Sequence, residues 1–268
     1  MKNEITMPKS LIIDNPVVSN IVFYPRKTPI PNNLPSNIKI LKLNILKNVV
    51  IGGIFCINDA DYPTILLFHG NGEVALDYLH FTNFFFDCKV NLAVVDFRGY
   101  GFSTGEPYYT SLLTDALPIY DAIKDWLINH DFNVSIFVEG RSLGSACASE
   151  IGAQNPPDLK GVIFESGFAS IFNMMTRLFR VSSPDLTPKI VSQFSNDIRI
   201  QNFTKPVLII HGTSDWIIPI SEAELIYNNI PNSIDKIFIK LQGAGHNDIF
   251  NYTNEFTQAM KDFISKYR

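Results

Sequence analysis

The segment Gly140–Gly144, which reads Gly-Arg-Ser-Leu-Gly, has the residue types and spacing most typical of chemistry in this chain. It follows a short apolar run and opens a stretch of helical composition. A serine on a sharp strand-to-helix turn adopts a strained backbone, and the flanking glycines prevent collisions with the neighbouring strand and helix. The hydroxyl of Ser142 is then exposed, which predicts a nucleophile rather than a serine that merely caps a helix.

A serine hydroxyl becomes a good nucleophile only when a base takes its proton, and five histidines are available. His246 is our candidate base, because it lies in a Gly-rich loop between the last apolar run and the final helical segment. His69 and His211 each precede a glycine at the end of a buried run, where hydrogen bonding to loop backbone is the usual role. His80 and His130 fall within or at the end of helical segments and are predicted to lie on the surface.

The base must be oriented by a carboxylate. Asp215 lies just past the turn that ends an apolar run, and Glu165 directly follows an earlier run and competes with it. We favour Asp215, and the chain order Ser142, Asp215, His246 is then the one expected for one particular fold. Asp96 is interpreted as a structural anchor for the loop that follows it.

Acyl transfer also needs N–H groups aimed at the developing oxyanion, each contributing about 3–4 kcal/mol to lowering the barrier. One donor is predicted to be the backbone N–H of Leu143, directly after the nucleophile. The other is predicted to be the N–H of Asn71, in the loop that follows the first buried run. The alternative is that this loop is only a tight turn.

Short, almost wholly apolar runs alternate with longer helical segments, and such runs are typical of parallel strands buried on both faces. These runs are Thr64 to Phe68, Leu92 to Val95, Ile136 to Val138, Gly161 to Phe164, Val207 to Ile210 and Ile237 to Leu241. Two earlier runs, Ile38 to Leu46 and Asn48 to Ile57, suit a hairpin. The pattern predicts an open α/β sheet whose ligands bind beyond the carboxyl ends of the strands.

Helical composition is found between these runs. The predicted helices are Glu73 to Asp87, Thr110 to about His130, a segment from just past Ser142 to before Pro156, Ser221 to Ile230, and Asp248 to Tyr267. Residues 1–36 carry several prolines and are predicted to form an irregular N-terminal arm, and residues 37–268 a single catalytic domain.

Composition excludes several classes of protein. The 268 residues are 46% hydrophobic, enough for a large core, and 22 basic against 26 acidic residues give a net charge of −4, which disfavours nucleic-acid binding. Cys56, Cys88 and Cys147 match no disulfide or zinc pattern, so we expect a reducing compartment and no metal. The longest apolar run, Val49 to Ile57, is about half of what spans a bilayer, and no secretory signal is evident. We expect a cytoplasmic protein without an integral membrane segment, and the oligomeric state stays open.

Five ordered motifs together resemble the α/β-hydrolase superfamily, nearest its Bem46-like branch. They are Phe68–Gly72, Asp96–Ser103, Gly140–Gly144, His211–Asp215 and Gly245–Asp248. The resemblance implies a mostly parallel twisted sheet of about eight strands with helices on both faces and a short cap. It also implies a serine hydrolase without cofactors, acting on a small-molecule or other acyl-bearing substrate; members include esterases, thioesterases, lipases and peptidases, and this branch includes protein depalmitoylases.

The stretch from about 167 to 204 lies where this fold carries its cap. Phe168, Phe172 and Met175 recur there at helical spacing, which predicts an apolar pocket for a medium-sized acyl group. Packing of this helix onto the body explains the stripe equally well.

We expect an ester or thioester hydrolase that works through an acyl-enzyme on Ser142. One alternative is a serine peptidase or amidase of the same fold. The other is a catalytically inactive relative that serves as a binding module, which predicts a degraded set of catalytic residues.

Overall fold

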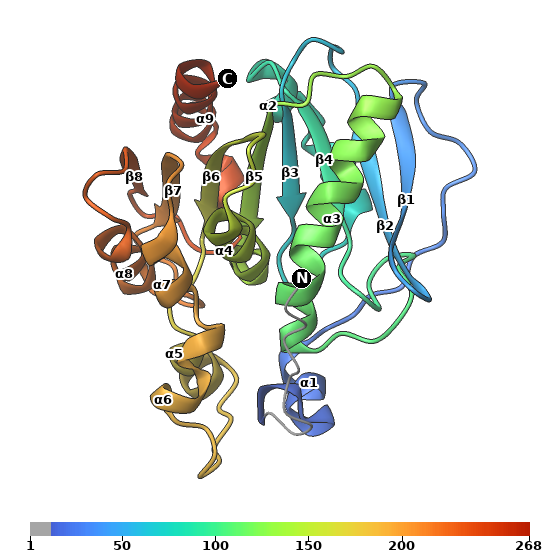
Figure 1. The fold of residues 1–268 in the computed structure, drawn as a ribbon. Helices are drawn as coiled ribbons and strands as arrows, with labels where there is room; N and C mark the ends of the chain where they lie inside the picture. The colour runs from blue at the N-terminus through green and yellow to red at the C-terminus, as the bar shows by residue number, and fades with distance from the viewer. Residues whose placement is uncertain (1–11) are drawn as a thin grey trace.

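A mixed eight-stranded sheet with helices on both faces dominates the computed structural model, which describes residues 12–268 (Figure 1). The strands are β1 (Ile38–Leu46), β2 (Val49–Cys56), β3 (Thr64–Phe68), β4 (Asn91–Val95), β5 (Ile136–Arg141), β6 (Leu159–Glu165), β7 (Val207–Gly212) and β8 (Lys236–Leu241). They lie in the order β1-β2-β4-β3-β5-β6-β7-β8. Only the β1–β2 and β2–β4 pairs are antiparallel. The predicted mostly parallel sheet of about eight strands is confirmed.

The helices lie mainly in the connections between strands. They are α1 (Pro16–Val22), α2 (Thr82–Asp87), α3 (Tyr109–Asn129), α4 (Ser145–Gln154), α5 (Ile171–Asn173), α6 (Pro188–Val191), α7 (Asn196–Arg199), α8 (Ile220–Asn229) and α9 (Thr253–Tyr267). Single 3₁₀ turns occur at Ile12–Asp14, Ala75–His80, Ser142–Gly144, Ser192–Phe194, Ile200–Asn202 and Ile249–Asn251, and a π turn at Met174–Leu178.

The sheet separates two apolar cores. On one face α3, α4 and α8 contribute buried side chains such as Tyr120, Ile151 and Ile226. On the other face α2 and α9 contribute Phe85 and Phe263, among others. Each fully buried side chain of this size stabilises the fold by roughly 1.5–3 kcal/mol. Cover on both faces is the reason why the central strands are apolar at every position.

The edge strand β8 departs from the expectation of burial on both faces. Its residues before Leu241 are half-buried or exposed, and Lys236 and Lys240 interrupt the apolar run. Lysines on an edge strand discourage pairing with another chain, so this strand has the composition of an edge and not of a sheet centre.

Two predicted helices are interrupted. The segment Glu73 to Asp87 contains a 3₁₀ turn followed by α2, because the backbone of Phe81 leaves the helical region at φ −110° and ψ 2°. The break places the ring of Phe81 on that of Phe250, with centroids 4.4 Å apart. The last segment likewise contains a 3₁₀ turn before α9 begins at Thr253.

The expectation of a wholly irregular arm was wrong for Pro16–Val22, which form α1. The side chain of Asn15 accepts a hydrogen bond from the N–H of Val17 at 2.9 Å, and Pro16 occupies the first helical position, where its missing N–H costs nothing. Val22 and Phe23 are buried in the core of the body. Residues 1–11 of the predicted arm lie outside the described residues.

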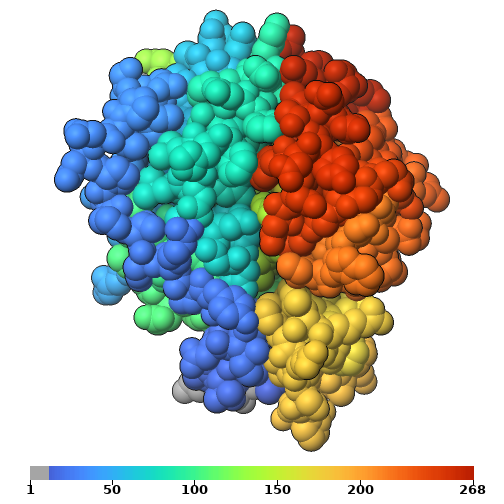
Figure 2. Space-filling model, turned by 180° about the vertical axis from the view of Figure 1, so that it is seen from behind, coloured from blue at the N-terminus to red at the C-terminus, as the bar shows by residue number. Residues whose placement is uncertain are grey.

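The segment between β6 and β7, residues 166–206, lies at the place of the predicted cap and is named the cap. It contains α5 to α7 and lies beyond the carboxyl ends of the strands, beside α1 (Figures 1 and 2). Across residues 12–268, no helix is both long enough and apolar enough to cross a membrane.

Candidate active site

Ser142 occupies the sharp turn between β5 and α4. Its backbone has a φ of +50°, a left-handed conformation that is strained for a residue with a side chain. A Cβ atom at Gly144 would lie 2.0 Å from the carbonyl oxygen of Phe68, and one at Gly140 would lie 2.6 Å from the carbonyl oxygen of Gly144. Both glycines are therefore required for α4 to pack this closely on the sheet.

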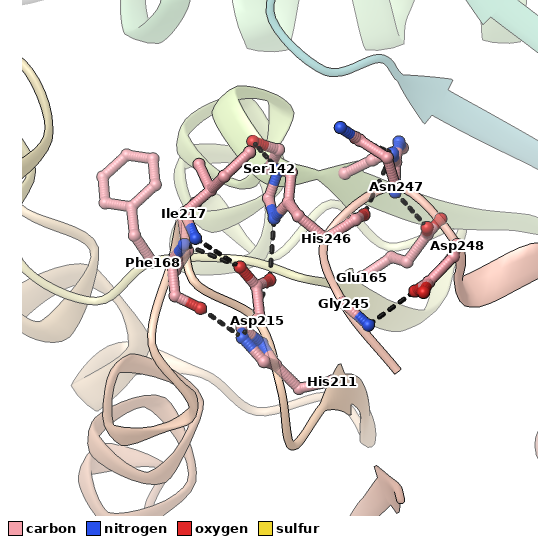
Figure 3. A network of polar contacts seen from close by, with 12 residues as sticks. Ser142, Glu165, Phe168, His211, Asp215, Ile217, Gly245, His246, Asn247 and Asp248 are labelled. Carbon is pink, nitrogen blue, oxygen red and sulfur yellow. Dashed lines mark hydrogen bonds and ion pairs between the residues drawn. The ribbon is translucent and has the colours of Figure 1, made fainter. Parts of the chain in front are cut away.

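The side chains of Ser142, His246 and Asp215 form a hydrogen-bonded chain (Figure 3). Nε2 of His246 lies 3.0 Å from Oγ of Ser142, and Nδ1 of His246 lies 2.7 Å from Oδ2 of Asp215. With the proton on Nδ1 donated to Asp215, Nε2 is free to accept the serine proton. The three residues come from the loops after β5, β7 and β8, which parallel strands bring to one edge of the sheet.

Asp215 is held by its own loop. Its Oδ1 accepts hydrogen bonds from the N–H groups of Ile217, at 2.9 Å, and Ile218, at 2.8 Å. Burial alone would raise the pKa of the Asp215 carboxyl, but the hydrogen bond and charge of His246 outweigh burial and leave that pKa below its ordinary value. Asp215 is therefore ionised, and it orients the imidazole ring.

Glu165, the competing acid, binds a different partner. Its Oε1 accepts a hydrogen bond from Nη1 of Arg141 at 2.5 Å, and the acid that contacts His246 is Asp215. Arg141 directly precedes Ser142 and is almost fully buried. The geometry thus agrees with Asp215 as the orienting carboxylate.

Arg141 links the ends of β5 and β6 with the loops after β3 and β8, and sequence reasoning did not single it out. Besides Glu165, its guanidinium donates to Oε1 of Glu73 at 2.8 Å, to the backbone oxygen of His246 at 3.3 Å and to Oδ1 of Asn247 at 3.2 Å. Burial alone would raise the pKa of Glu73, but Arg141 lowers it below its ordinary value. Arg141 therefore connects the turn that carries Ser142 with the loop that carries His246.

Glu139 lies two residues before Arg141 on β5 and is fully buried. Within the described chain no N–H or hydroxyl group reaches its carboxyl oxygens or Oε2 of Glu165, and the two carboxyls are close enough to share a hydrogen bond when one of them is protonated. Burial first, and the charge of Glu165 second, raise the pKa of Glu139 well above its ordinary value. A neutral Glu139 is the form that this environment favours.

The loop after β3 approaches Ser142 from the other side. Gly70, Asn71, Ser142 and Leu143 line one cavity. Across residues 12–268, no loop, turn or side-chain hydrogen bond engages the N–H of Asn71 or of Leu143. Both predicted oxyanion donors therefore lie beside the nucleophile.

The side chain of Asn71 fastens this loop to the segment that follows α1. Its Nδ2 donates to the backbone oxygen of Val22 at 2.6 Å. Its Oδ1 accepts from the N–H of Tyr24 at 3.1 Å and from the hydroxyl of Tyr100 at 2.6 Å. The N-terminal segment thus sets the position of the candidate oxyanion loop, and Tyr24 lines the same cavity as Ser142.

The other histidines do not contact Ser142, although Nε2 of His211 lies 3.4 Å from Oδ2 of Asp215. Nδ1 of His69 is 2.7 Å from the backbone oxygen of Gly70, and Nε2 of His211 is 2.8 Å from that of Ile218. Both are buried and bind loop backbone, whereas His80 and His130 are exposed.

The cavity beside Ser142 has a volume of about 240 Å³. Its apolar lining comes from both sides of the opening: Tyr24, Leu143, Met174, Leu178, Phe179, Ile217 and Ile218. A second cavity of about 310 Å³ shares Met174, Leu178, Ile217 and Ile218 with the first and extends along the cap. The two cavities together form a mostly apolar groove that leads to the serine.

The predicted pocket residues are not the ones that line the serine cavity. Met175 is buried in the core, Phe172 packs against the core, and Phe168 lines the second cavity. Packing onto the body, the alternative explanation of the stripe, accounts for Phe172 and Met175. The π turn Met174–Leu178 begins after Phe172, and its hydrogen bond from the N–H of Phe179 to the oxygen of Met174 adds one residue to the turn before Phe179. A helical period of 3.6 therefore selects the wrong side chains here.

Comparison with known proteins agrees with this geometry. Residues 61–202 match the model of the family described as serine aminopeptidase, S33. Human alpha/beta hydrolase domain-containing protein 17B is 28% identical over 216 residues, which cover 79% of this chain and 69% of that protein, and its Xenopus laevis counterpart is 27% identical over the same shares.

Two solved structures share the fold. An esterase of Pyrococcus furiosus superposes with a TM-score of 0.72 at 19% identity and covers 91% of this chain and 98% of its own. An acylaminoacyl peptidase of Pyrococcus horikoshii gives a TM-score of 0.67 at 14% identity, covering 86% of this chain but 41% of its own.

Proposed function

Because the chain belongs to the serine aminopeptidase S33 family of the α/β-hydrolase superfamily, we propose that it hydrolyses a carboxylic ester or thioester through an acyl-enzyme on Ser142. The observation that carries the proposal is the hydrogen-bonded chain from Ser142 through His246 to Asp215 at the end of an apolar groove. An inactive binding module would have no need to keep these three side chains hydrogen-bonded to one another.

In the first half of the reaction, Nε2 of His246 takes the proton of Ser142 as Oγ attacks the acyl carbon. Negative charge develops on the former carbonyl oxygen, and the N–H groups of Leu143 and Asn71 stabilise it. The imidazolium, held by ionised Asp215, then gives its proton to the departing alcohol or thiol, which leaves the acyl group on Ser142.

In the second half, His246 takes a proton from water as the water oxygen attacks the acyl-enzyme. The carboxylic acid leaves, and the proton returns to Oγ of Ser142. The cavity beside Ser142, at about 240 Å³, lies just below the range of roughly 300–1,000 Å³ typical of ligand pockets, which supports an acyl group of no more than medium size.

Amide hydrolysis is the second candidate, because the matching family is described as aminopeptidases. The same residues could cleave an amide, with His246 protonating the departing amine. Ester and thioester chemistry is preferred here because the lining of the groove beside Ser142 is mainly apolar.

A panel of p-nitrophenyl acyl esters, acyl thioesters and aminoacyl p-nitroanilides of graded chain length tests the proposal. We expect turnover of the esters or thioesters that Ser142→Ala abolishes and that Ser149→Ala, a change of the same type on α4, preserves. Hydrolysis confined to the anilides would favour the peptidase, and ester turnover that survives Ser142→Ala would contradict the proposal.

A further inference from the structure

The second cavity of the groove adjoins the cavity at Ser142 and has a different lining. It shares four apolar residues with the serine cavity but adds two cationic side chains, Arg177 and Arg180. Both arginines come from the cap, just before and just after the apolar pair Leu178 and Phe179. A ligand that fills both cavities would therefore place one end at Ser142 and the other at two guanidinium groups.

Within the described residues these two arginines have no partner, which distinguishes them from four other arginines. Arg26, Arg98, Arg141 and Arg199 each form an ion pair with a carboxylate. Within the described residues 12–268, neither Arg177 nor Arg180 forms an ion pair or a side-chain hydrogen bond. Their donors are available to a ligand.

The one acid in the lining of the second cavity does not neutralise them. Both oxygens of Glu222 are occupied: Oε2 accepts from the N–H groups of Ala169 and Ser170, at 3.0 and 2.9 Å, and Oε1 accepts from Nδ2 of Asn173 at 2.7 Å. Glu222 is 4% exposed. The carboxylate thus holds the start of the cap, and the accessible charge of the cavity is positive.

An apolar surface lies between the serine and the arginines. Trp216, next to Asp215, is 93% exposed and lines the second cavity together with Leu178 and Ile217. An indole left in water beside a catalytic loop gains contacts when an apolar chain covers it. The groove therefore presents a nucleophile, an apolar floor and two cations in sequence.

We propose that the second cavity binds an anionic group of the substrate, a carboxylate or phosphate, with Arg177 and Arg180 as its ligands. The inference rests on the proposed function, and it narrows the substrate to an ester or thioester whose apolar chain ends in an anion. The same charges oppose the ammonium group of an aminopeptidase substrate, because like charges repel in a partly desolvated site.

The kinetic test compares two matched series of esters. Mono-p-nitrophenyl esters of α,ω-dicarboxylic acids are compared with p-nitrophenyl esters of the monocarboxylic acids of equal chain length. We expect kcat/KM at the best length to favour the anionic ester at least tenfold, because a hydrogen bond to a charged group is worth about tenfold or more. Raising ionic strength should shrink this preference, since the arginines are exposed.

Variants assign the preference to the two arginines. In Arg177→Gln/Arg180→Gln the ratio of the two kcat/KM values should fall at least tenfold, whereas Arg268→Gln, a matched change at a residue that lines neither cavity, should leave the ratio unchanged. Loss of activity on both series in equal proportion, or a wild-type protein that hydrolyses both series equally, would overturn the inference.

A binding measurement keeps the inference testable if the proposed function fails. In the Ser142→Ala background, octanoate should shift the emission of Trp216 at lower concentration than octan-1-ol does, and Arg177→Gln/Arg180→Gln should remove the difference. Trp216→Phe identifies the reporter, because Trp126 then remains. Equal binding of acid and alcohol would overturn the anion site, whereas a wild-type protein that binds octanoate through the arginines but hydrolyses no ester would overturn the proposed function alone.

Discussion

The body and the cap build the two walls of the site in different ways. The body wall, at the ends of β5, β7 and β8, holds Ser142, Asp215, His246 and Arg141 in short hydrogen bonds. The cap wall leaves Arg177 and Arg180 without a partner in the described chain and borders on Trp216, which is 93% exposed. The comparison indicates that the polar side chains of the body are held in place before a substrate binds, whereas the exposed groups on the cap side gain their partners from the substrate.

The largest effect should come from breaking the body wall at Asp215. Asp215→Asn removes the charge that holds the tautomer of His246, and we expect kcat on a p-nitrophenyl ester to fall about 10⁴-fold. Glu165→Gln, the matched change at the competing acid, should cost less than about tenfold, because Glu165 contacts Arg141 and not His246. A larger loss in Glu165→Gln than in Asp215→Asn would move the acid to β6.

Arg141→Lys should disturb the same wall by displacing the side chains that Arg141 holds, because the positive charge itself is kept. Lysine keeps the positive charge but cannot reach Glu73, Glu165 and the base loop at once. We expect kcat to fall roughly 10- to 100-fold with little change in KM, because a displacement of His246 of about 1 Å is enough for such a loss. Arg199→Lys, at an ion pair with Glu150, is the matched control and should leave kcat within about twofold. An unchanged kcat in Arg141→Lys would remove Arg141 from the positioning role.

Glu139→Gln tests the protonation state of this buried carboxyl in the body wall, through the pH dependence of the free energy of unfolding. The pKa of Glu139 is raised in the folded protein, so the folded state binds more protons than the unfolded state above the ordinary pKa of a glutamate. This group's contribution to the free energy of unfolding therefore falls as pH rises toward the raised pKa, by at most about 1.4 kcal/mol per pH unit.

Glutamine has no such proton to lose, so denaturant unfolding should show the variant gaining stability relative to the wild type as pH rises from about 4. Asp215 and Glu73 have lowered pKa values, so their contribution to the free energy of unfolding is lost as pH falls. This opposite dependence is present in both the wild type and the Glu139→Gln variant. Parallel pH profiles for the two proteins would contradict the neutral form of Glu139.

The smallest effect should appear at Trp216, in the loop after β7 that borders the cap wall. Trp216→Ala removes a side chain that is 93% exposed, and we expect the free energy of unfolding to change by no more than about 0.5 kcal/mol. Phe164→Ala in the buried sheet, by contrast, should cost about 3–5 kcal/mol. A large destabilisation in Trp216→Ala would mean that this residue supports the fold, and the contrast between the two walls would fail.

The body wall was largely predictable from sequence, because buried parallel strands leave an apolar run that ends at the functional loop. The runs before His69, Ser142 and Asp215 therefore located the sheet edge, and glycines at Gly140 and Gly144 identified the turn. Arg141 was missed because Glu73, in the loop after β3, and Glu165, at the end of β6, are distant in sequence, and only the strand order brings them together.

The cap and the N-terminal segment were less predictable. Met174, Leu178 and Phe179 line the serine cavity, whereas Phe172 and Met175 pack onto the core, and the helical period alone does not distinguish these two faces. The prolines after residue 24 led us to predict an irregular segment in place of α1, although Asn15 followed by Pro16 is typical of a helix start. The division of the chain at residues 36 and 37 stays a prediction.

Labelling with a fluorophosphonate probe tests the central claim most directly, because the probe reacts with a serine only when a neighbouring base activates it. We predict that the wild-type protein is labelled at Ser142, that Ser142→Ala is not labelled, and that Ser149→Ala is labelled like the wild type. Labelling that persists in Ser142→Ala, or a folded wild-type protein that does not react at all, would contradict the assignment of Ser142 as an activated nucleophile.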